Sequence, residues 1–180
     1  MKVSDGVFRG LLCLVVLSCL ACGGQDEVTP ADPGTEGNPE PAAAPSSPET
    51  PEDVGEAIGA IYVDAMKKVI EMGKDHPPFE EIKPKLKALK DECISRLVKL
   101  GKVKDGLAEE QKAKINRTVR AKMAEVRSLF TEYGNAANYY MNKDRETYEL
   151  FTSFNVITQY ADFDLLRKQE PEEAKRLGIE

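Results

Sequence analysis

The chain has 180 residues, of which 41% are hydrophobic and 31% charged, and its formal net charge is −6. This length suits one ordinary domain with additional segments, and an acidic chain lacks the broad basic surface that nucleic-acid binding requires. The acidity is local: residues 23–52 contain seven acidic residues and no basic one, whereas residues 53–180 contain 23 of each. The region after residue 52 is therefore formally neutral, and we expect no nucleic-acid partner.

Residues 1–21 have the order of a secretory signal peptide. Lys2 and Arg9 supply the positive charge, and an uninterrupted apolar run extends from Gly10 to Ala21. This run is about a dozen residues long, whereas a membrane-spanning helix needs about 20. We therefore expect an export signal rather than a permanent transmembrane helix.

The leader ends in the sequence Leu20-Ala21-Cys22-Gly23-Gly24. It resembles the lipobox of bacterial lipoproteins, in which small residues precede a cysteine. A cysteine thiolate is nucleophilic enough at neutral pH to take a lipid as a stable thioether. The resemblance implies cleavage before Cys22, acylation of Cys22 with chains such as palmitate, and a lipid anchor in the cell envelope. By analogy with enteric bacteria, Gly23 in place of Asp after the cysteine implies the outer membrane.

A second cysteine leaves the position of the lipid open. Cys19 stands where the family usually has Leu, and the overlapping sequence Val16-Leu17-Ser18-Cys19 also resembles the motif. Cys19 is therefore the alternative lipidated residue. With Cys22 lipidated, Cys93 is the remaining cysteine and no intrachain disulfide forms; with Cys19 lipidated, Cys22 remains to pair with Cys93.

Residues 22–52 begin with the lipidated cysteine and continue as a Pro-rich acidic segment. Between residues 23 and 52, Val28 is the only aliphatic branched or aromatic residue. Such a segment cannot bury enough surface to offset the entropy of ordering it. We predict a disordered tether that holds residues 53–180 away from the bilayer.

Beyond residue 53, apolar residues recur every three or four positions, which indicates amphipathic helices. The first helix is expected to end at Gly73, before the break at Pro77-Pro78. The second is expected to close at Gly101, with Pro84 tolerated only in its first turn.

The third predicted helix is the longest and runs from Leu107 to Tyr133, with Asp105 as N-cap and Gly134 as the stop. An ambiguous link at residues 135–142 leads to a fourth helix, and a short turn is expected after Pro171. The apolar residues of the fourth helix are Tyr148, Phe151, Phe154, Ile157, Ala161 and Leu165.

Together these helices predict an all-α fold for residues 53–180, either a four-helix up-down bundle or helical hairpins, after the disordered tether. The length of the third helix keeps open an extended helix pair that dimerises as a coiled coil, and hence a homodimer.

The charges of the helical region are distributed unevenly. Residues 74–127 carry 15 basic and nine acidic residues, and residues 128–180 carry six basic and ten acidic. This asymmetry fits either a basic face for anionic partners or, preferably, helix faces that attract one another when packed.

Nine of the twelve aromatic residues lie between Phe130 and Phe163. Helical spacing assigns five of them to the core: Phe130, Tyr133, Tyr148, Phe151 and Phe154. The other four flank the ambiguous regions, and they fit either core packing or a partly exposed partner surface, because tyrosine gives large contact area for little entropy. These four are Tyr139, Tyr140, Tyr160 and Phe163.

Residues with catalytic or metal-binding chemistry are few. His76 is the only histidine, so it can complete neither a diiron site nor, with Cys93, a zinc site. It lies beside Pro77, where we expect an exposed loop. Cys93 falls on the apolar stripe of the second helix and is expected in the core. We therefore expect no enzyme, no metal and no cofactor.

The sequence favours a membrane-anchored envelope lipoprotein whose helical domain has a structural role or interacts with another envelope protein. The alternative is a helical module that binds a small apolar or peptidic ligand.

Overall fold

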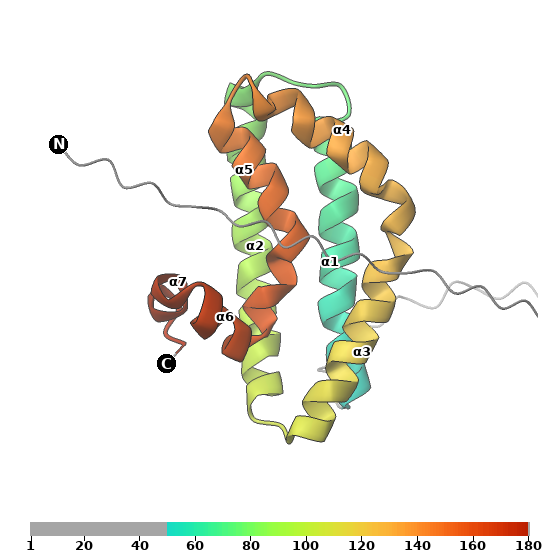
Figure 1. Ribbon diagram of the computed structural model, residues 1–180, viewed down its shortest axis with the longest axis vertical. Helices are drawn as coiled ribbons and strands as arrows, with labels where there is room; N and C mark the ends of the chain where they lie inside the picture. The colour runs from blue at the N-terminus through green and yellow to red at the C-terminus, as the bar shows by residue number, and fades with distance from the viewer. Residues whose placement is uncertain (1–49, 180) are drawn as a thin grey trace, which may run out of the picture. The chain divides into compact units, whose positions relative to one another are not determined.

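The computed structural model describes residues 50–179, which are helical apart from short connections (Figure 1). Within this range there are seven α-helices, two 3-10 helices and no strand, so the all-α prediction is confirmed. The signal peptide, Cys19, Cys22 and nearly all of the tether lie outside the described residues. The elements are α1 (Pro51–Gly73), α2 (Phe79–Asp105), α3 (Glu109–Glu125), η1 (Arg127–Leu129), α4 (Phe130–Met141), α5 (Arg145–Ser153), η2 (Phe154–Ala161), α6 (Phe163–Gln169) and α7 (Pro171–Arg176).

Helix α1 is the element around which the others are arranged. It packs most extensively along α3 and also contacts α2, α4 and η2, while α2 packs against α5 and η2. Successive long segments run in alternating directions, and α6 with α7 lies beside the C-terminal half of α2 (Figure 1). The core is formed by the apolar stripes of these elements, as expected for narrow amphipathic helices that are not stable alone.

Helix α1 begins with a capping box. The Thr50 hydroxyl accepts a hydrogen bond from the Asp53 amide at 3.1 Å, and the Asp53 carboxylate accepts one from the Thr50 amide at 3.0 Å. The helix therefore starts at Pro51, two residues before the predicted domain boundary. Its C-terminal end at Gly73 agrees with the prediction.

Helix α2 does not stop at Gly101, as predicted, but continues to Asp105. Gly101 is required for packing instead, because a Cβ atom there would lie 2.5 Å from Cε1 of Phe163. Pro84 is in the second turn of α2 rather than the first. Both Pro84 and Glu80, whose carbonyl the proline cannot engage, are exposed to water.

The long third helix of the prediction is wrong, because the structure divides it into α3, η1 and α4. Asp105 belongs to α2, and the N-cap of α3 is Ala108, whose amide donates to the Gln111 side chain at 3.1 Å. Gly134 lies inside α4 and does not end a helix. The break at η1 changes the helical phase, so Phe130 is 42% exposed rather than in the core.

The predicted fourth helix is also divided, into α5, η2 and α6. Two aspartates begin its α-helical parts: Asp144 accepts from the Thr147 amide at 2.8 Å, and Asp162 accepts from the Leu165 amide at 3.1 Å. The link at residues 135–142 is mostly helical and belongs to α4, and the turn expected after Pro171 is α7.

Ion pairs join the basic segment 74–127 to the acidic segment 128–180. Lys83 lies 3.1 Å from Asp144 and 3.0 Å from Glu146, and Lys104 lies 2.7 Å from Asp162. The charge asymmetry therefore supports the interpretation that packed helix faces attract one another.

The contact between α1 and α3 depends on two glycines one turn apart. A Cβ atom on Gly55 would lie 2.7 Å from the Thr118 Cβ, and one on Gly59 would collide with the Lys122 Cβ. Gly134 in α4 is different, because no atom lies within 4 Å of its Cβ position. The first two glycines allow close helix approach, and the third has open space.

We predict opposite effects of alanine at these glycines. Gly59→Ala should lower the free energy of unfolding by about 1 kcal/mol or more, because overpacking costs about 1–3 kcal/mol and outweighs the gain in helix propensity. Gly134→Ala should raise it by roughly 0.5–1 kcal/mol, since alanine is the better helix former. Urea denaturation of the full chain, followed by circular dichroism, measures both; equal stabilisation by the two variants would contradict the close α1–α3 contact.

Candidate functional site

The structure places three of the four residues of the predicted partner surface in the core. Tyr140, Tyr160 and Phe163 are only 1%, 7% and 7% exposed, and Tyr139 is half-buried. The surface interpretation is therefore wrong for these three residues, and the core-packing interpretation describes them. Cys22 and Cys19, the predicted lipidation residues, lie outside the described range.

Specific contacts explain the burial of the two tyrosines. The Tyr140 hydroxyl donates to the Pro77 carbonyl at 2.7 Å, and its ring stacks on Phe151 with 5.3 Å between centroids. The Tyr160 hydroxyl donates to the Glu173 carboxylate at 3.3 Å. Burial raises the pKa of each phenol from its usual value near 10 to about 12, with Glu173 adding to the effect at Tyr160. Both hydroxyls are thus neutral donors that hold elements together.

Tyr139 lies at the surface beside the loop after α1. His76 is exposed, as predicted, and its ring stacks on Tyr139 with 4.1 Å between centroids. The Lys143 ammonium lies 3.3 Å from the centroid of the same ring. His76 has a positive φ of 49°, an uncommon backbone conformation for a residue other than glycine.

An open groove of about 540 Å³ lies between α1, the end of α3, α4 and the α5–η2 segment. Its wall is largely aromatic: Tyr62, Phe130, Tyr133 and Tyr148 contribute to it, with Asn138 and Asn155 as polar groups. The Tyr133 hydroxyl donates to the Phe151 carbonyl, which fixes this wall to α5, and burial raises the pKa of Tyr133 well above its usual value. Gly134 also lines the groove and leaves it unobstructed.

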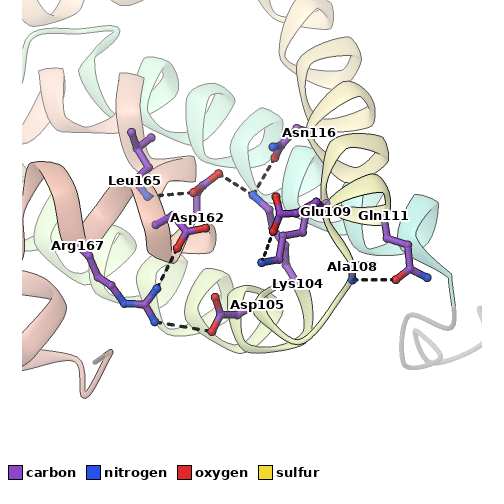
Figure 2. A network of polar contacts seen from close by, with 11 residues as sticks. Lys104, Asp105, Ala108, Glu109, Gln111, Asn116, Asp162, Leu165 and Arg167 are labelled. Atoms are coloured by element: carbon purple, nitrogen blue, oxygen red, sulfur yellow. Dashed lines mark hydrogen bonds and ion pairs between the residues drawn. The ribbon is translucent and has the colours of Figure 1, made fainter.

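A second site surrounds Lys104 at the end of α2 (Figure 2). The residue is only 6% exposed, and its ammonium donates to the Asp162 carboxylate at 2.7 Å and to the Asn116 side-chain oxygen at 2.8 Å. The ammonium of Lys104 thus links α2 to α3 and to the residue that caps α6. A cavity of about 200 Å³ adjoins it.

The electrostatics of this second site favour the ionised pair. Burial alone would raise the pKa of Asp162, but hydrogen bonds from Lys104 and from the Leu165 amide, together with the nearby ammonium charges, bring the net pKa below its usual value. Stability from a carboxyl with a lowered pKa is present at neutral pH and is lost as the pH falls through its folded-state value. The Asp162 carboxyl should therefore stay ionised when the pH falls to the lower part of the ordinary aspartate range.

The remaining reactive side chains are poorly placed for chemistry. Cys93 is 3% exposed, and burial raises the pKa of its thiol, with the charge of Glu92 adding to this, so the reactive thiolate is disfavoured. Within residues 50–179, no three His, Cys, Asp or Glu side chains gather closely enough to hold a metal ion. In the same range, every helix is too short or too polar to span a bilayer.

Comparison with protein-family models, with curated proteins and with solved structures finds no match to this chain.

Sequence reasoning missed the Lys104 site. One signal was present: Lys104 continues the spacing of the buried stripe of α2, seven residues after Leu97 and three after Gly101. A lysine on the buried stripe of a helix needs a buried partner. The spacing does not identify that partner, because Asp162 is 58 residues away along the chain.

We predict that Lys104→Met lowers the free energy of unfolding by about 2–4 kcal/mol. Removing one partner of a buried pair leaves an uncompensated charge at a cost of about 3–5 kcal/mol, and the partial exposure of Asp162 reduces this. Lys68→Met is the matched control, because its ion pair with Asp64 is at the surface and of little consequence. Thermal and urea unfolding of the full chain measure the difference; similar losses in the two variants would contradict a special role for Lys104.

Proposed function

We propose that this chain is a lipid-anchored protein of the bacterial cell envelope, held to the membrane through an acylated Cys22, and that its helical domain acts by contact with another envelope protein. The observation that carries the proposal is the lipobox-like sequence Leu20-Ala21-Cys22-Gly23-Gly24 at the end of an export signal. Two or three acyl chains would hold the protein firmly, since each buried methylene contributes about 0.8 kcal/mol. The outer membrane is the proposed location.

The Pro-rich segment before α1, residues 23–49, fits this arrangement as a spacer. Its residues would extend to about 80 Å as polyproline II, at roughly 3.1 Å per residue, and less as a flexible coil. Its six acidic residues would be repelled by anionic headgroups, which favours a domain held away from the bilayer.

A structural or interaction role for the helical domain is supported by how its buried polar groups are used. Lys104 and Tyr160 each join different helical elements through their hydrogen bonds, and Tyr140 joins α4 to the loop between α1 and α2. We propose that the helices form an up-down four-helix bundle, in which α3 with α4 and α5 with η2 are two interrupted arms. The alternating chain direction and the contacts of α1 with α2, α3 and η2 support this.

The anchor is tested by mass spectrometry of the mature N-terminus. We expect cleavage before Cys22 and a mass increment of two or three acyl chains on that cysteine. Cys22→Ser should abolish acylation and release the protein from envelope membranes, because serine cannot form the thioether.

The matched control is Cys19→Ser, which should leave both processing and membrane association intact. An unmodified Cys22 or an uncleaved leader would refute the anchor at this position, and loss of acylation in Cys19→Ser alone would assign the lipid to Cys19.

A second candidate function is a binding module for a small apolar or peptidic ligand. The specific observation that favours it is the open aromatic groove, in which Phe130 remains 42% exposed. Ligand pockets are commonly apolar with a few polar groups, and their volumes are about 300–1,000 Å³. The groove has this composition, and its polar residues are Asn138, Thr152 and Asn155.

Binding of the neutral dye Nile red to the full chain tests the groove. We expect saturable fluorescence enhancement and a roughly threefold to tenfold weaker dissociation constant for Phe130→Ala, because a lost aromatic contact removes about 0.5–1.5 kcal/mol. Val156→Ala is the matched control, since Val156 is 53% exposed and lies outside the groove. Equal affinities of the two variants would exclude the groove as the dye site.

A further inference from the structure

The cavity beside Lys104 combines a buried cation with an apolar wall. It opens at the surface near Arg120 and Leu165, both of which are exposed, and it reaches Lys104, which is 6% exposed. Val119 and Met123 of α3 provide part of the apolar wall. The cavity is therefore accessible from water at one end and charged at the other.

The ammonium group of Lys104 has one hydrogen-bond donor without a partner among residues 50–179. An ammonium group has three donors, and Lys104 uses two of them, on Asp162 and Asn116. Asp162 already accepts from Lys104 through one oxygen and from the Leu165 amide through the other. The third donor of Lys104 therefore remains for a ligand that accepts hydrogen bonds.

The charges that line the cavity point to the same ligand chemistry. Lys104 and Arg120 are positive and Asp162 is negative, which leaves one excess positive charge. Within residues 50–179, Arg120 forms no ion pair or hydrogen bond and is exposed, so its guanidinium is available at the mouth. Arginine binds carboxylates well because its planar donors match their geometry.

The volume limits the size of the ligand. About 200 Å³ is several times the share of one water molecule in the liquid, about 30 Å³, and it is smaller than the about 300–1,000 Å³ of pockets for drug-sized molecules. A short hydrocarbon chain fits the space beside Val119 and Met123, and a monoanionic head neutralises the excess charge.

We propose that this cavity is a binding site for a small aliphatic carboxylate, whose carboxylate contacts Lys104 and Arg120 and whose chain lies against the apolar wall. The cavity shares Met123 with the aromatic groove, but Lys104, Arg120 and Asp162 do not line that groove, and the site does not depend on the lipid anchor. The anchor test reads the mass of the N-terminus, so the failure of either proposal is distinguishable from the failure of the other.

Binding is measured on the full chain in non-ionic detergent by calorimetry, with nuclear magnetic resonance of the side-chain amides of Asn116 and Gln159 to locate the ligand. The probes are sodium butyrate, butyramide and inorganic phosphate. We expect butyrate to bind with a dissociation constant of about 1 mM or below, as suits so small a ligand. Butyramide, which lacks the charge, and phosphate, which lacks the chain, should bind at least about tenfold more weakly.

Two variants that preserve the Lys104–Asp162 pair test the location. Arg120→Gln should weaken butyrate binding by about threefold to tenfold, while Arg117→Gln, an exposed arginine of the same helix outside the cavity, should leave it unchanged. Leu165→Trp should narrow the cavity and weaken binding at least about tenfold without unfolding the chain, because Leu165 is already exposed at 38%.

Several results would overturn the proposal. These are equal binding of butyrate and butyramide, equal effects of Arg120→Gln and Arg117→Gln, unchanged binding in Leu165→Trp, or no saturable binding up to about 10 mM butyrate, which is ten times the expected constant. Tight binding of phosphate alone would assign the cavity to inorganic anions and would overturn the aliphatic part.

Discussion

The ammonium group of Lys104 is almost sealed from water, and a buried charge must be neutralised and hydrogen-bonded where it lies. Asp162 and Asn116 meet this requirement from two other elements. This one contact therefore fixes the positions of three segments relative to one another. They are the end of α2, the part of α3 that carries Asn116, and the beginning of α6. Asp162 also caps α6 through the Leu165 amide, so a single carboxylate couples a local helix start to a long-range ion pair.

Close packing imposes a second constraint, at glycines inside helices. Gly101 faces the ring of Phe163, and Gly55 and Gly59 face Thr118 and Lys122. At these positions the absence of a side chain matters more than backbone freedom, since the helices continue through them. Packing also explains Gly73, the last residue of α1, because its φ is not positive and a Cβ atom there would lie 2.8 Å from the Ala136 Cβ.

Local patterns in the sequence were enough for the helical class, for the end of α1 at Gly73 and for the burial of Cys93. They failed where tertiary packing decided the outcome. The break at η1 is marked by neither proline nor glycine, so periodicity alone extended one helix to Tyr133 and put Phe130 in the core. The partners of Tyr140 and Lys104 are 63 and 58 residues distant along the chain, and no local pattern identifies such pairs. The groove and the Lys104 site in the helical domain were therefore found in the structure, whereas the lipidation site was predicted from the sequence.

The capping box of α1 makes the start of this helix a local property of the sequence. Thr50 and Asp53 supply each other's hydrogen bonds, and Pro51 at the first helical position has no amide hydrogen to satisfy. The direction in which α1 begins is thus encoded within four residues. The chain before Thr50 can change in length or composition without altering that start, so under the proposed lipid anchor the spacer could vary while the helices stay the same.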